Sequence, residues 1–262
     1  MIQVVIAYVM NLILGDPPGW PHPVKVISDF VSRMECSLKA RYKDPRGEKK
    51  AGIILCTAVV FLTFAVAYAL MFVASVLGRY AVMAVNIILM YTAFDARGLD
   101  VKMSKVHRSL KIGDVACARK ALSPMVSNAE HLDQDDISKV AVKVIIENIN
   151  DRIVAPLMYA VIGGAPLALV YRAVSVLNAM LDVKEDGHAH LGWASAKLNG
   201  ILNFIPARIT KLATLAAAEI LRYDNETKAV EADGIIGAIK VMYASSVISL
   251  LFFLLVKFLL TA

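Results

Sequence analysis

The stretch GIILCTAVVFLTFAVAYALMFVASVL, Gly52 to Leu77, contains no charged residue. One helix needs about 20 consecutive apolar residues to cross a bilayer, so this stretch is long enough to span a membrane. Hydrophobic residues make up 58% of the 262 residues, whereas about 45–50% is usual in soluble domains. We therefore predict an integral membrane protein whose helices satisfy their own backbone polar groups.

Apolar runs recur on both sides of this stretch. Gly78 and Arg79 interrupt the first run, residues 80–94 resume it, and residues 241–260 form the last run. Residues 2–14 are apolar but shorter than a full span, and 153–181 contain GGAP, which predicts a hairpin of two short helices. We predict an all-α, polytopic protein of the cell membrane, with about four or five membrane segments.

Basic residues cluster beside the apolar runs and give the chain a net charge of +6. This distribution matches the positive-inside bias and does not require a nucleic-acid partner. Both ends of the hairpin 52–94 are basic, which places them on the cytoplasmic side. The three cysteines show no paired spacing, so neither a disulfide framework nor a zinc site is predicted.

The segments between the apolar runs have distinct patterns. Residues 96–150 have apolar residues at helical spacing, which predicts an amphipathic helical insertion in the cytoplasm, with His107 facing water. Residues 182–211 are predicted to be irregular, and 222–234 a charged linker. We predict that residues 1–262 form a single membrane domain.

The stretch IIENINDRIVAP, Ile145 to Pro156, is the first candidate site. Glu147 and Asp151 are four residues apart, so a helix places both carboxylates on one face, with Asn148 beside them. Two carboxylates and amide oxygens suit Mg²⁺, which commonly also holds a phosphate. The alternative is an ordinary solvated helix face, on which Arg152 neutralises an acid.

Two further stretches carry ionisable groups beside prolines. LGDPPGWPHPVKVIS, Leu14 to Ser28, places Asp16 and His22 in a rigid segment after the first helix. Such a backbone suits a polar cavity, although Asp16 could instead only form a turn. In LNGILNFIPARIT, Arg208 could bind a phosphate or carboxylate, or serve as a positive-inside anchor.

Several motifs together resemble one family. GDPPGWPHPVKVIS resembles a GDP-x-x-x-HPV opening, and IENINDRIVAPLMYAVIGGAPLALVYRAVSVLNAM resembles an EN-x-x-D…APL-x-Y…GG-x-P…YRAVN core. LGWASAKLNGILNFIPARIT resembles an LDD-x-x-N-x-x-PARLT segment, and RGLD and GDVACARKALS also match in spacing. Over about residues 1–211 the chain is similar to the adenosylcobinamide-phosphate synthase family of cobalamin biosynthesis, the CbiB/CobD family.

The resemblance implies a membrane ligase that joins aminopropanol, or its phosphate, to the corrinoid adenosylcobyric acid through an amide, using ATP and Mg²⁺. It implies catalytic roles for Glu147, Asp151 and His22, and a magnesium site at Glu147 and Asp151. The substrate-binding candidates are Asp16, Lys25, Asn148, Lys184, Asn203 and Arg208. The implied partners are the corrinoid, aminopropanol phosphate and the lipid bilayer.

The sequence departs from the family pattern at four carboxylate positions. These acids fall on Ala129, Asn178, Asn199 and Gly200, and the family's C-terminal SPN-x-G segment has no counterpart. Asparagine preserves the shape of aspartate but not its charge, which weakens metal binding. The alternative is therefore a degenerate, non-catalytic member that binds a corrinoid or a partner protein. A homo-oligomer or a second subunit that supplies the missing acids also stays open.

Overall fold

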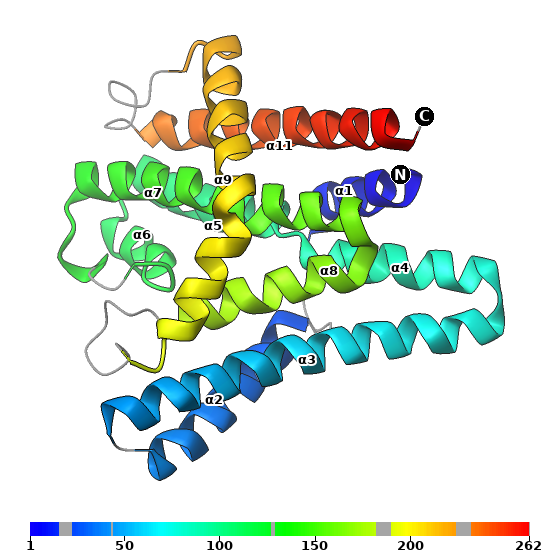
Figure 1. Ribbon diagram of the computed structural model, residues 1–262. Coiled ribbons are helices and arrows are strands. Elements are labelled where there is room, and N and C mark those ends of the chain that lie inside the picture. Colours follow the sequence, from blue (N-terminus) through cyan, green and yellow to red (C-terminus); the bar gives the residue numbers. More distant parts are fainter. Residues whose placement is uncertain (16–22, 43, 127–128, 182–189, 224–231, 262) are drawn as a thin grey trace. The chain divides into compact units, whose positions relative to one another are not determined.

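The computed structural model (Figure 1) describes residues 1–262 except 16–22, 43, 127–128, 182–189, 224–231 and 262. The described residues form helices and connecting segments, with no strand among them. In chain order the elements are α1 (Ile2–Leu14), α2 (Pro23–Arg41), α3 (Pro45–Leu77), α4 (Arg79–Ala93), α5 (Ala96–Lys111), α6 (Val115–Leu122), η1 (Ala129–His131), α7 (Gln134–Ile149), η2 (Asn150–Val154), α8 (Ala155–Met180), α9 (Trp193–Ile220) and α11 (Ala232–Thr261).

Five helical stretches are long and apolar enough to cross a membrane. They are Arg46–Leu77, Arg79–Lys111, Gln134–Met180, Trp193–Ile220 and Asp233–Leu260. Large apolar side chains such as Phe61 and Phe72 on α3 are exposed, as expected of a helix whose solvent is lipid. The prediction of an all-α, multi-pass protein of the cell membrane with four or five segments is confirmed.

The chain divides into two compact units. Unit 1 comprises Met1–Asn11, Asp16–Phe94 and Ala155–Pro206, and unit 2 comprises Leu12–Gly15, Asp95–Val154 and Ala207–Ala262. The prediction of a single domain stays a prediction.

Unit 1 contains the helical hairpin of residues 52–94. Asp44 caps α3 by accepting a hydrogen bond from the Gly47 backbone N–H at 3.0 Å, and Pro45 occupies the first turn, where its missing N–H costs nothing. Gly78 separates α3 from α4 with φ +109°, a backbone angle that glycine adopts most readily. The sequence-predicted break at Gly78 is confirmed.

The helix α8 turns back on itself in unit 1, as Figure 1 shows. Gly163 and Gly164 have non-helical backbone angles, and Gly164 has φ +70°. Asn86 on α4 accepts a hydrogen bond from the Ala165 N–H at 3.0 Å, which satisfies a donor that the break exposes. The prediction of two short helices over 153–181 is confirmed.

The core of unit 1 lies among α2, α3 and α8. It is built from fully or nearly fully buried aliphatic residues, including Val31, Leu55, Val59, Leu177 and Leu181. Gly52 on α3 approaches the backbone at Leu191 closely. A Cβ at position 52 would lie 2.2 Å from the Leu191 carbonyl oxygen, so a larger residue would not fit without a shift.

Unit 2 contains the segment predicted as an amphipathic insertion. The described part of residues 96–150 forms α5, α6, η1 and α7, whose buried faces carry Leu99, Met103, Ile137 and Ile145. Asp133 caps α7 by accepting from the Asp136 N–H at 2.8 Å. The predicted amphipathic helical insertion is therefore confirmed in α5, α6 and α7, and its cytoplasmic side stays a prediction.

Two predictions about the C-terminal half need correction. Residues 193–211 are not irregular, because α9 is a continuous helix from Trp193 to Ile220. Its Pro206 removes one backbone hydrogen bond, which membrane helices tolerate. The last helix begins at Ala232 rather than 241, because residues 234–239, between Asp233 in its first turn and Lys240, continue the apolar pattern. Most of the predicted linker 222–234 lies outside the described residues.

Candidate functional site

The candidate residues fall into three groups. Glu147, Asn148, Asp151 and Arg208 belong to unit 2. The candidates in unit 1 are Lys25, which is exposed on α2, and Asn203 on α9. The candidates Asp16, His22 and Lys184 lie outside the described residues.

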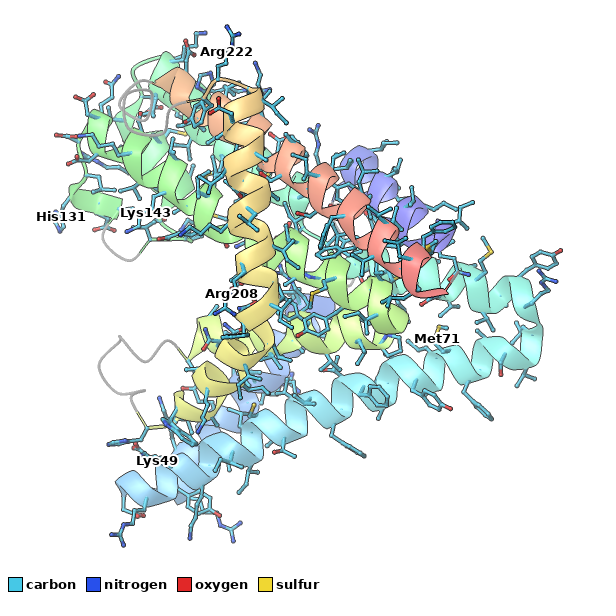
Figure 2. The ribbon with its side chains drawn as sticks, turned by 45° about the horizontal axis from the view of Figure 1, so that its top comes forward. Lys49, Met71, His131, Lys143, Arg208 and Arg222 are labelled. Atoms are coloured by element: carbon cyan, nitrogen blue, oxygen red, sulfur yellow. The ribbon has the colours of Figure 1, made fainter. Side chains whose placement is uncertain are left out.

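The two carboxylates proposed for magnesium lie at a change of helix type. Glu147 is in the last turn of α7, its side chain is 63% exposed, and its Oε1 lies 3.8 Å from Lys143 Nζ. Asp151 lies in η2, which is a π-helix. Lys143 is labelled on α7 in Figure 2. Single π-helical turns inside longer helices are rare and occur frequently at functional sites.

Arg152 holds the next candidate, Asn148, in place. Its Nε donates to Asn148 Oδ1 at 2.7 Å, and the Asn148 Nδ2 donates to the Val144 carbonyl at 2.8 Å. Its Nη1 donates to Oδ2 of Asp95, a residue only 5% exposed. Arg152 thus pairs with the acid Asp95, and not with Glu147 as an ordinary solvated helix face would predict.

Asp95 ties the start of α5 to η2 a second time. Its backbone N–H donates to the Arg152 carbonyl at 3.1 Å. A buried carboxylate is costly unless it is paired and hydrogen-bonded, so the Asp95–Arg152 pair fixes the position of η2 within unit 2.

The other side of η2 faces α9. Thr210 Oγ1 donates to Asn150 Oδ1 at 2.9 Å, and Asn150 Nδ2 donates to Asp151 Oδ1 at 2.7 Å. A hollow of about 330 Å³ opens here, and its lining includes Asn150, Thr210 and Lys211. Arg208 is exposed on α9 two residues before Thr210 (Figure 2). The acidic motif and the PARIT motif therefore meet within unit 2.

A second buried acid, Asp100, lies on α5 in the RGLD motif. It is 8% exposed and accepts three hydrogen bonds, from Arg97 Nη1 at 2.6 Å, Ser104 Oγ at 2.9 Å and Tyr243 Oη at 2.8 Å. Three donors satisfy most of the lone pairs of a carboxylate. This acid therefore joins α5 to α11.

Gly15, the last described residue before the proline-rich stretch, packs against the same helix. Its φ is +60°, and a Cβ at this position would lie 2.7 Å from Arg97 Cγ. A larger residue at 15 would thus have to displace the arginine that binds Asp100. Unit 2 thus combines four distant parts of the sequence. They are the segment that ends at Gly15 and the segments that contain Arg97, Asp151 and Thr210.

Sequence reasoning missed several of these polar residues. Asp95, Asp100 and Tyr243 were not among the site candidates. RGLD served in the sequence analysis only as a motif that matches the family. An acid at the end of an apolar run, as in TAFDARGLD, could also have indicated a functional acid near the membrane. Tyr243 lies in an apolar run and had no signal of its own. His107, predicted to face water, is only 8% exposed, because α5 turns this side chain toward Asp233, 3.9 Å away.

In unit 1, Asn203 belongs to a neutral network. Its Oδ1 accepts from Tyr171 Oη at 2.6 Å, and its Nδ2 donates to Asn199 Oδ1 at 3.3 Å. The Tyr171 ring stacks on Tyr159 with centroids 5.1 Å apart. Asn199, one of the four departures, therefore supplies a neutral acceptor where the family pattern has an acid.

The other departures differ in their surroundings. Ala129 is buried in η1, whereas Asn178 on α8 is half-buried. Gly200 is exposed on α9, and a Cβ there would meet nothing within 4 Å. An aspartate therefore fits at 200 without displacing a neighbour.

The donor set at η2 is compatible with magnesium but small. No group of three or more histidine, cysteine, aspartate or glutamate side chains suited to a metal ion occurs among the residues that the structure describes. Mg²⁺ usually retains several waters and is held by one or two carboxylates together with substrate phosphates. Glu147 and Asp151 can supply that number of ligands.

Comparison with known proteins gives a consistent relationship. The model of the CobD/Cbib protein family matches residues 4–247. A cobalamin biosynthesis protein CobD of Clostridium perfringens is 38% identical over 223 residues, which cover 85% of this chain and 70% of the relative. Proteins of the same name from Listeria monocytogenes and Citrobacter koseri are 34% and 33% identical, over 83% and 84% of this chain and 69% of each relative. No solved structure gives a significant match. The chain belongs to the CobD/Cbib protein family.

Proposed function

We propose that this protein acts in cobalamin biosynthesis as an ATP-dependent ligase that joins aminopropanol, or its phosphate, to adenosylcobyric acid. The family membership and the names of the relatives support the pathway. The observation that carries the site is the hydrogen bond between Thr210 and Asn150, which brings the PARIT motif to the acidic motif beside a hollow of about 330 Å³.

The reaction needs an activated carboxylate. In the proposed sequence the γ-phosphoryl group of ATP passes to a corrinoid propionate oxygen, and ADP leaves. The amine nitrogen of aminopropanol then attacks the acyl carbon, a C–N bond forms, the C–O bond to phosphate breaks, and the nitrogen loses a proton. Little covalent work falls on the protein in such a transfer, which depends mainly on positioning and on stabilising charge.

The residues of unit 2 take the following roles in this proposal. Glu147 and Asp151 would hold Mg²⁺, which supplies charge neutralisation on the transferring phosphoryl group. Lys211 lines the hollow beside η2, Arg208 lies on the same helix, and both would bind phosphate. Asp95 acts through Arg152, which fixes Asn148, and is a positioning residue. Roles for Asp16, His22, Lys25, Lys184 and Asn203 stay as expectations from the family resemblance.

A second candidate function is non-catalytic binding of a corrinoid or a partner protein. The four positions where carboxylates are replaced, Ala129, Asn178, Asn199 and Gly200, favour it. Loss of acids that would share metal binding or proton transfer weakens the standard chemistry while leaving a shaped ligand site.

The experiment that separates the two uses the full chain in lipid nanodiscs. The protein is given adenosylcobyric acid, aminopropanol phosphate, Mg²⁺ and ATP, and the corrinoid products are weighed by mass spectrometry. We expect a mass gain that equals amide formation. Loss of a residue that only supports a metal ligand reduces activity by about 10–100-fold. Glu147→Gln or Asp151→Asn, which alter a proposed ligand itself, should reduce the rate by more than this.

The matched control is Asp135→Asn, which removes an exposed acid from the first turn of α7 and should leave the rate unchanged. The Clostridium perfringens relative is assayed in parallel. If that relative forms product and this protein does not, ligation is overturned. Retention of the corrinoid by equilibrium dialysis in that case supports the binding function.

A further inference from the structure

A second and larger hollow lies in unit 2, away from η2. It has a volume of about 650 Å³ and is lined by residues from the end of α5, the end of α9 and the start of α11. Those residues are His107, Lys111, Leu221, Tyr223, Asp233, Gly234, Ile236, Gly237 and Lys240. Small-molecule sites are usually about 300–1,000 Å³, so this hollow has the size of a ligand site.

Specific local structure builds one wall of this hollow. The end of α9 is closed by two hydrogen bonds, from Tyr223 N to the Ala218 carbonyl at 2.9 Å and from Arg222 N to the Glu219 carbonyl at 3.1 Å. Arg222, labelled in Figure 2, has φ +49°. This is the Schellman pattern, in which the chain reverses after a helix. It directs Tyr223 back toward α11.

Tyr223 then fixes the start of α11. Its Oη donates to the Gly234 carbonyl at 2.7 Å. A Cβ at Gly237 would lie 2.2 Å from the Tyr223 ring, so only glycine allows the ring to pack here. The tyrosine is 8% exposed. Specific contacts therefore build this wall of the hollow.

The charge of the lining favours an anion. Lys111 in the last turn of α5 and Lys240 on α11 both line the hollow and are exposed. His107 and Asp233 face each other, with Nε2 and Oδ1 3.9 Å apart. Asp233 is the acid in the lining, against two lysines from two different helices. The Tyr223 ring forms an aromatic wall of the hollow. The Gly234 carbonyl accepts the hydrogen bond from the Tyr223 hydroxyl.

We propose that this hollow binds a phosphate group, with Lys111 and Lys240 as its two cationic ligands. Ammonium groups bind phosphate as point charges, and two lysines on separate helices can approach one phosphate from different sides. The group belongs either to a soluble phosphate compound or to an anionic lipid headgroup, because α11 begins a membrane span here. The proposal goes beyond the ligase function and does not depend on it.

The test measures binding and not turnover. Detergent-solubilised full-length protein is titrated calorimetrically with inorganic pyrophosphate in one arm. In the other arm its retention of phosphatidic acid against phosphatidylcholine is measured by native mass spectrometry. We expect the double variant Lys111→Ala/Lys240→Ala to lose at least about tenfold in affinity for the probe that binds. Asp233→Asn should strengthen the same binding severalfold, because it removes the opposing charge.

The control variant is Lys102→Ala/Lys105→Ala, which removes two exposed lysines of α5 that do not line the hollow. It changes the net charge equally and should leave binding intact. Binding of pyrophosphate identifies a soluble ligand, and selective retention of phosphatidic acid identifies a lipid headgroup. The proposal is overturned if neither probe binds, or if the control variant loses as much affinity as the Lys111/Lys240 variant.

Discussion

The two compact units join their helices with different chemistry. In unit 1 the hydrogen bonds between distant segments are largely neutral: Asn11 donates to the Phe94 carbonyl at 3.0 Å, Asn86 donates to Gln3 and accepts from Ala165, and Tyr171 donates to Asn203. In unit 2 carboxylates take part as well, at Asp95 and Asp100, alongside neutral bonds such as that from Thr210 to Asn150. Asp95 and Asp100 are the buried acids among the described residues, and both belong to unit 2.

This difference separates a packing role from a functional one. Neutral hydrogen bonds between membrane helices average only about 0.6 kcal/mol each, yet they hold helices together without burying a carboxylate. Buried acids in membrane segments are expensive and usually mark functional sites. Unit 2 keeps two of them beside the family's motifs, whereas unit 1 carries neutral Asn178 and Asn199 and Gly200 at positions where the family pattern has acids.

The largest effect is expected from breaking the Asp95–Arg152 pair. Asp95→Ala leaves the Arg152 guanidinium in unit 2 without this carboxylate. Removing one partner of a buried ion pair costs about 3–5 kcal/mol, and we expect the free energy of unfolding to fall by that amount. Denaturation by sodium dodecyl sulfate in mixed micelles, followed by tryptophan fluorescence, measures it.

A double variant controls for the general loss of packing. Asp95→Leu together with Arg152→Met removes both charges and should recover most of the lost stability, because no uncompensated charge remains. It should not recover ligation, since Asn148 and η2 lose their support. If the double variant loses the sum of the two single losses, the pair is not coupled and the comparison between the units fails.

A smaller effect is expected at the second buried acid. Tyr243→Phe removes one of the three donors to Asp100 and leaves those from Arg97 and Ser104 in place. A hydrogen bond to a charged group contributes about 1.5–3 kcal/mol, and the remaining donors should keep the loss near the lower value. The same detergent titration measures it.

The matched control is Tyr80→Phe, on an exposed tyrosine of α4, which should change stability by less than about 0.5 kcal/mol. Equal losses from both tyrosines would contradict the importance given to Asp100.

Removing neutral hydrogen bonds of unit 1 should lower the free energy of unfolding by less than Asp95→Ala or Tyr243→Phe does. Asn86→Leu removes its hydrogen bonds to Gln3 and to the Ala165 N–H beside the break in α8. At about 0.6 kcal/mol for each bond, the expected loss is about 1 kcal/mol, with ligation retained. A loss as large as that of Asp95→Ala would show that neutral and charged contacts do not differ as we argue.

Much of the fold could be predicted from the sequence, because the signals are local. The span Gly52 to Leu77, the break at Gly78 and the reversal at Gly163 and Gly164 each depend on a few neighbouring residues. The failures came from context. Pro206 and the polar residues before it suggested an irregular segment, yet α9 continues through them, because one proline removes a single backbone hydrogen bond and membrane helices tolerate that loss.

The site was predictable only in part, for the same reason. The spacing of Glu147 and Asp151 and the PARIT motif identified two elements, and the Thr210–Asn150 bond brings these elements together. Asp95 and Tyr243 find their partners 57 and 143 residues away along the chain. No local pattern encodes such pairings. The π-helical turn at η2 was equally invisible, because the sequence predicted an ordinary helix there.

The smallest expected effect concerns an acid position that unit 1 has lost. Gly200 lies inside α9, is exposed, and leaves open space for a Cβ. Alanine is preferred over glycine in a helix by about 0.5–1 kcal/mol, so Gly200→Ala should raise stability by that amount in the detergent titration. Gly200→Asp should keep about the stability of the unmodified protein, because its carboxylate has room at this exposed position and aspartate is only slightly better than glycine in a helix. If Gly200→Asp destabilises strongly while Gly200→Ala does not, unit 1 rejects charge at this position. The loss of the acid would then be part of how this unit is built, rather than a change that an added carboxylate could reverse.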